Sequence, residues 1–115
     1  MAISEFEVKR CERELEKFLK AKRPPPHVRK QLDFAYRIEN QNVELLEIRP
    51  ELQNPAKKMQ QPFAKATFIK KDKLWKIYWQ GQDLKWQSYQ PAPSVQFFEE
   101  FLAIVSTDAN ACFFG

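Results

Sequence analysis

Residues 63–89 read FAKATFIKKDKLWKIYWQGQDLKWQSY. Within this stretch, apolar and polar side chains alternate in three short runs: 63–70, 74–80 and 84–89. A period of two is typical of β-strands, because neighbouring residues of a strand point to opposite faces. The runs are separated by Lys71-Asp72-Lys73 and Gly81-Gln82-Asp83, which are short enough to make neighbouring strands antiparallel. The stretch therefore predicts three strands of an antiparallel sheet.

The same alternation appears upstream, in residues 32–39 and 43–49. Asn40-Gln41-Asn42 lies between these two runs and has the composition of a tight turn, so we expect a hairpin. Residues 50–62, PELQNPAKKMQQP, contain three prolines and few apolar side chains. Because proline cannot donate a hydrogen bond to a sheet, we expect a long loop from Pro50 to Pro62, either mobile or functional.

The N-terminal residues predict a helix over 4–22. Ser4 and Glu7 have the spacing of a capping box, and the apolar side chains that follow recur every three to four residues. Pro24-Pro25-Pro26 cannot continue a helix, because none of the three has a backbone N–H.

A second helix is expected to begin at Ser94, a favourable N-cap residue that follows Pro91-Ala92-Pro93. The order is then a helix, five strands and a helix. This order predicts an α+β fold in which a five-stranded antiparallel meander is flanked by an N-terminal and a C-terminal helix in two layers. The 115 residues are enough for one domain, 1–115.

The positive charge of the chain is concentrated in one segment. Six lysines and two aspartates in residues 65–89 give that segment a net charge of +4, equal to the net charge of the whole chain. All three tryptophans lie in it as well. Cations beside large rings suit an anionic, ring-bearing partner such as single-stranded nucleic acid. They also suit a packed hairpin with lysines on its solvated side.

Alternation indicates which side chains point away from the helices. We expect Trp75, Ile77 and Trp79 to point inward, and the same for Leu46 and Ile48. The outward set is then Arg37, Glu47, Arg49, Lys65, Lys76 and Tyr78. From these and the following hairpin we take as candidate nucleic-acid or anion-binding residues Arg37, Arg49, Lys65, Lys76, Tyr78 and Lys85. The alternative is a solvated face with cross-strand ion pairs, and the tryptophans are expected in the core.

Catalytic chemistry finds little support in the sequence. His27 is the only histidine, and Gly81 and Gly115 are the only glycines, so neither a histidine-based triad nor a glycine-rich phosphate loop is indicated. A metal-dependent nuclease would need Asp33 and Glu47 to converge near Lys65, with Arg49 beside them. We therefore predict a non-catalytic binding module, with no catalytic residue, no metal and no cofactor.

Two cysteines, Cys11 and Cys112, lie near opposite ends of the chain. We favour two free buried thiols, and a disulfide between the termini stays open as the alternative. Isolated cysteines, together with the lack of a signal-peptide pattern or an apolar stretch near 20 residues, predict a cytoplasmic protein that does not enter a membrane.

A second class of function also stays open, namely a homodimer or a contact with another protein. Its motivation is the proline-containing segment 50–62 and the apolar tail Phe113-Phe114, since exposed rings often mark interfaces. The tail fits equally well as a lid over the core.

Several stretches together resemble a known family: RPPPHVRKQLDFAYRIE (23–39), VELLEIRP (43–50), AKATFIKKDKLWKIYW (64–79), DLKWQSYQPAP (83–93) and CFFG (112–115). The chain is similar to small bacterial proteins catalogued as domain of unknown function 3024. The resemblance covers nearly the whole length. It implies a stand-alone bacterial cytosolic protein with this order of elements, and it carries no activity, substrate or site residue.

Overall fold

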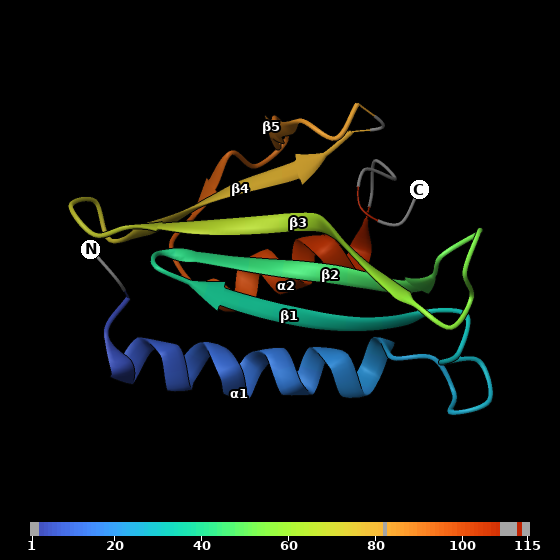
Figure 1. Ribbon diagram of the computed structural model, residues 1–115. Coiled ribbons are helices and arrows are strands. Elements are labelled where there is room, and N and C mark those ends of the chain that lie inside the picture. Colours follow the sequence, from blue (N-terminus) through green and yellow to red (C-terminus); the bar gives the residue numbers. More distant parts are fainter. Residues whose placement is uncertain (1–2, 82, 109–112, 114–115) are drawn as a thin grey trace.

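The computed structural model describes residues 3–81, 83–108 and 113. It has two layers, a twisted sheet with α1 running alongside β1 and α2 behind the strands (Figure 1). The elements follow in the order α1 (Glu5–Lys22), β1 (Asp33–Glu39), β2 (Asn42–Pro50), β3 (Lys58–Ile69), β4 (Leu74–Gln80), β5 (Trp86–Ser88), β6 (Ser94–Val95) and α2 (Phe98–Thr107).

The sheet is an open antiparallel meander in the order β1-β2-β3-β4-β5, with β6 pairing β4 outside this path. The predicted α+β class, the five-stranded meander and the helix at each end are therefore confirmed. The two-residue strand β6 was not predicted, and β5 is shorter than the run 84–89.

The helix α1 forms where the capping pattern places it. The hydroxyl of Ser4 accepts a hydrogen bond from the backbone N–H of Glu7 at 3.3 Å, and Glu5 and Glu7 complement the positive end of the helix dipole. Cys11, Leu15 and Phe18 form its buried stripe. The helix ends at Lys22, directly before Arg23 and the three prolines.

One core joins both helices to one face of the sheet. Its strand residues include Val43, Leu45, Ala66 and Ile77, all at most 1% exposed. Phe113 also belongs to this core and lies 5.2 Å from the ring of Tyr89, centroid to centroid. Phe113 is therefore placed as a core residue, whereas Cys112 and Phe114 fall outside the described residues. Cys11 is a free, buried thiol.

The predicted loop from Pro50 to Pro62 was wrong in extent. β2 continues through Pro50 and β3 already begins at Lys58, so the connection is residues 51–57. Prolines are tolerated here because Pro50 ends its strand and Pro62 lies beside a β-bulge. At the bulge, Leu45 pairs with Ala64 and Leu46 with Pro62, so Phe63 is the extra residue.

The predicted start of the second helix was also wrong. Ser94 belongs to β6, where it pairs with Lys76, and α2 begins at Phe98. The helix is capped instead by Glu100, whose carboxylate accepts a hydrogen bond from the backbone N–H of Phe97 at 2.9 Å. Among the described residues, no helix is long and apolar enough to cross a membrane.

Candidate ligand-binding face of the sheet

The face of the sheet opposite to the helices carries a row of polar side chains from five strands. Cross-strand pairing connects Arg37 to Glu44, Glu44 to Lys65, Lys65 to Tyr78, and Tyr78 to Ser88. Directly paired residues share a face. The core residues next to them in sequence point to the helix side, so this row lies on the other side, which we call the open face.

Lys65 is the centre of the open face. Its ammonium lies 4.9 Å from the ring centroid of Tyr78 and 4.6 Å from that of Trp86. Both distances are within the range of a cation–π interaction. The pKa of Lys65 is lowered, mainly because partial burial removes water from the ammonium, while the charge of Glu44 acts in the opposite direction. Within the described chain, Lys65 forms no ion pair.

Two further candidate residues, Arg37 and Lys76, share the open face with Lys65, and a third, Lys85, precedes β5. Arg37 donates two hydrogen bonds to one carboxylate oxygen of Glu44, the longer of them 2.9 Å, and hydrogen bonding to Glu44 raises the pKa of the guanidinium. Lys76 is exposed and pairs with Thr67 in the next row. Lys85 is exposed and directly precedes Trp86 in the chain.

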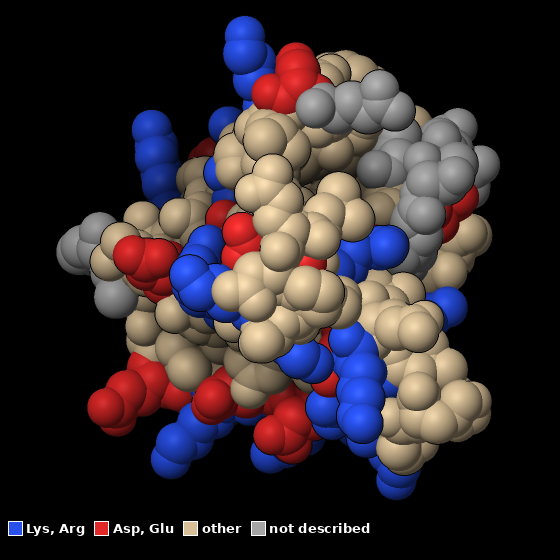
Figure 2. Space-filling view, turned by 45° about the vertical axis from the view of Figure 1, so that its right-hand side comes forward, with Lys and Arg blue, Asp and Glu red and all other residues tan. Residues whose placement is uncertain are grey.

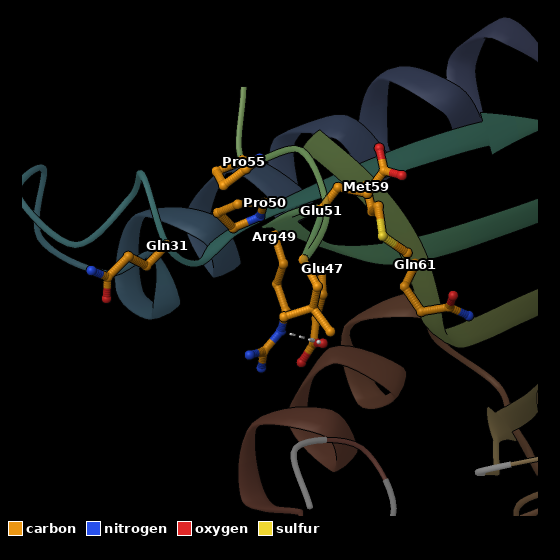
Figure 3. A pocket seen from close by; sticks show the side chains of 9 residues that line it. Gln31, Glu47, Arg49, Pro50, Glu51, Pro55, Met59 and Gln61 are labelled. Atoms are coloured by element: carbon orange, nitrogen blue, oxygen red, sulfur yellow. Dashed lines mark hydrogen bonds and ion pairs between the residues drawn. The ribbon is translucent and has the colours of Figure 1, made fainter. Parts of the chain in front are cut away.

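The outward placement predicted for Glu47 and Arg49 was wrong. Val43 and Leu45 are in the core, so alternation puts Glu47 and Arg49 on the helix side of β2, and Leu46 and Ile48 on the open face. Figure 3 shows both charged side chains extending toward the side on which α2 lies. There Nε of Arg49 donates to Glu47 at 3.3 Å, beside a cavity lined by residues of the 51–57 loop.

The three tryptophans divide between the two sides of the sheet. Trp75 is 2% exposed in the core, and Trp79 is half-buried against it. The expectation of a core position was wrong for Trp86, whose ring instead covers Lys65 on the open face. Sequence reasoning missed both Trp86 and Glu44. The sequence feature that could have identified Trp86 was its position next to a turn, because neighbouring side chains cover a ring at the end of a strand only in part.

The carboxylates that a nuclease would need do not converge. Asp33 pairs with Ile48, so it lies on the face opposite to Glu47. Both oxygens of Asp33 accept hydrogen bonds from Arg23 at 2.7 Å, and this contact lowers the pKa of the carboxyl. Within residues 3–81, 83–108 and 113, no three His, Cys, Asp or Glu side chains gather as metal ligands.

Charge is mixed over the end of the molecule that Figure 2 turns forward. Lys and Arg side chains are interspersed with Asp and Glu there, and they do not form one broad basic surface.

A comparison with family models identifies the family of the chain. The family model described as "Domain of unknown function (DUF3024)" matches residues 3–115. The chain belongs to this family. No curated protein and no solved structure matches the chain. Membership of DUF3024 thus fixes the family and leaves the function to be argued from the site.

Proposed function

We propose that the open face binds single-stranded nucleic acid, as a binding module without catalytic activity. The observation that carries this proposal is the position of Lys65 between Tyr78 and Trp86. Proteins that bind single strands combine cations for the phosphates with rings on which bases stack. Here both kinds of group lie on one face, which neither α1 nor α2 covers.

The neighbouring cations extend this arrangement along the strands. Lys76 lies one row away from Lys65 on the open face, so a phosphate next to the one held by Lys65 has a second lysine on the same surface. Lys85 directly precedes Trp86 and adds an exposed cation at the start of β5. Lys65 has no carboxylate partner of its own among the described residues. A phosphate bound beside Lys65 supplies the negative charge that no carboxylate of the described chain supplies there. This pairing stabilises an ammonium that has lost part of its surrounding water.

Arg37 and Glu44 modulate the site. Glu44 opposes an anionic ligand, and it also holds the guanidinium of Arg37. Removing the carboxylate frees Arg37 and removes a like charge, so Glu44→Gln is expected to strengthen binding. A substitution that improves binding is informative, because general damage to the fold would weaken it.

The test is a titration of labelled single- and double-stranded DNA and RNA at two salt concentrations. We expect preference for single strands, with Trp86→Leu weakening binding by roughly 5- to 150-fold, the equivalent of one lost stacking contact of about 1–3 kcal/mol. Lys65→Met should reduce the slope of log affinity against log salt by about 0.7, the value for one phosphate of a single strand.

The matched control is Lys20→Met, which removes the same charge from the exposed surface of α1. It should leave the affinity close to that of the wild type. Absence of binding at low salt would refute the proposal. Equal losses from Lys20→Met and Lys65→Met would show that only net charge matters and would refute the assignment of the site.

A further inference from the structure

The loop 51–57 holds an apolar side chain out in solvent. Leu52 is 99% exposed. The loop that carries it is closed by a hydrogen bond from the N–H of Glu51 to the carbonyl of Lys57 at 2.9 Å. A second bond, from Lys57 to the carbonyl of Asn54 at 2.9 Å, forms a turn with Pro55 at its second position. A braced loop loses little entropy when it is bound.

Leu52 stands at the rim of a cavity of about 630 Å³. The apolar part of the lining comes from Pro50, Pro55 and Met59, and Met59 is itself 50% exposed. The paired side chains of Glu47 and Arg49 project into the same region (Figure 3). One surface patch therefore contains both an exposed apolar side chain, Leu52, which we call the anchor, and an apolar cavity, which we call its receptor.

We propose that this patch joins two copies of the chain, with Leu52 of each copy entering the cavity of the other. A two-fold interface uses the same patch on both subunits. This requires the anchor and its receptor to be neighbours on one molecule, and Leu52 on the rim of its own cavity meets that requirement. The surface is separate from the open face, so the proposal does not rest on nucleic-acid binding.

The charges of the loop fit a second copy. Glu51 lines the cavity, and Lys57 lies directly across the loop from it, because the N–H of Glu51 donates to the carbonyl of Lys57. In a dimer with the two-fold axis between the two loops, Glu51 of each copy faces Lys57 of the other. The patch is thus self-complementary in charge as well as in shape. Because one short loop on each side contributes, the interface is small and the association is weak.

The test is the molar mass from sedimentation equilibrium at protein concentrations from about 1 µM to 1 mM, the range of weak association. We expect the mass to rise from monomer to dimer, and Leu52→Asp to remain monomeric. Leu84→Asp is the matched control, because Leu84 is also exposed, at 62%, and lies in the turn between β4 and β5. It should dimerise as the wild type does.

Charge reversal tests the predicted geometry. Glu51→Lys alone and Lys57→Glu alone each place like charges opposite each other, so each protein should stay monomeric. An equimolar mixture of the two restores both attractive contacts and should form a heterodimer. A wild type that remains monomeric at 1 mM overturns the proposal, as does a dimer whose mass Leu52→Asp does not change.

Discussion

At the scale of single residues, the sheet uses its rings for two different purposes. Trp75 lies 5.0 Å from both Phe68 and Phe98, centroid to centroid, and so joins the sheet to α2. Trp86 and Tyr78 instead cover the ammonium of Lys65. Removing Trp75 would open the core, whereas Trp86 contacts a surface cation. The same residue type therefore has a structural position on one face and a candidate binding position on the other.

Cys11 gives a prediction at this scale. Burial raises the pKa of its thiol to about 12, and the charge of Glu7 acts in the same direction. Since the thiolate is the reactive form, three pKa units correspond to roughly a thousandfold less thiolate at pH 8. In a Cys112→Ser protein, where one thiol remains, Cys11 should react with a disulfide reagent at least about a thousandfold more slowly in buffer than in urea. Comparable rates in the two solvents would contradict its burial.

At the scale of elements, the ion pair between Arg23 and Asp33 connects the segment after α1 to the start of β1. Arg23 follows the last residue of α1, and its guanidinium holds both oxygens of Asp33, the first residue of β1. The N–H of Phe34 also donates to Asp33 at 2.8 Å. Because the proline segment lies between these two residues, the contact links the two ends of that segment.

This ion pair predicts a pH dependence of stability. The pKa of Asp33 is lowered in the folded protein, chiefly by Arg23. Its contribution to stability is therefore present above the unfolded pKa of about 3.9 and is lost as the pH falls through the lower folded pKa. Asp33→Asn should lower the melting temperature at pH 7, and the difference from the wild type should shrink on acidification below pH ~4.

Asp72→Asn is the control for this measurement. Asp72 is exposed in the turn between β3 and β4, and it forms no ion pair with the described residues. Its substitution should leave the melting temperature nearly unchanged at both pH values. A penalty from Asp33→Asn that stayed constant down to pH 2 would show that packing, and not the charge of Asp33, is responsible.

The elements differ in how far the sequence determines them. α1 was predicted to within one residue, because its cap at Ser4 and the prolines after it are local signals. The face to which each side chain of β2 points was not predicted correctly. Val43, Leu45, Leu46 and Ile48 are all apolar, so alternation is compatible with either face. The pairing of Val43 with Ala66 decides which face it is. That pairing is a contact between two strands, so the sequence of β2 alone does not contain it. Arg49 was misplaced for this reason, whereas strand pairing places Arg37, Lys65, Lys76 and Tyr78 on the face that alternation predicted.

At the scale of the whole molecule, the two proposed surfaces lie apart. The open face is the uncovered side of the sheet, whereas the patch around Leu52 lies at the loop end and on the helix side of β2. A dimer formed through the loop presents two open faces. A single-stranded nucleic acid long enough to reach both faces then binds the second face at a raised effective concentration. Leu52→Asp should therefore weaken the binding of long oligonucleotides more than that of short ones.

The most direct test of the open-face proposal is the ¹⁵N–¹H spectrum of the three indole groups during titration with a short single-stranded oligonucleotide. We predict that the Trp86 signal shifts with increasing oligonucleotide and that the Trp75 signal does not, because Trp75 is 2% exposed in the core. The backbone signals of Lys65, Lys76 and Tyr78 should shift together with Trp86. A spectrum in which Trp86 stays fixed while residues of α1 or α2 shift would contradict binding at the open face.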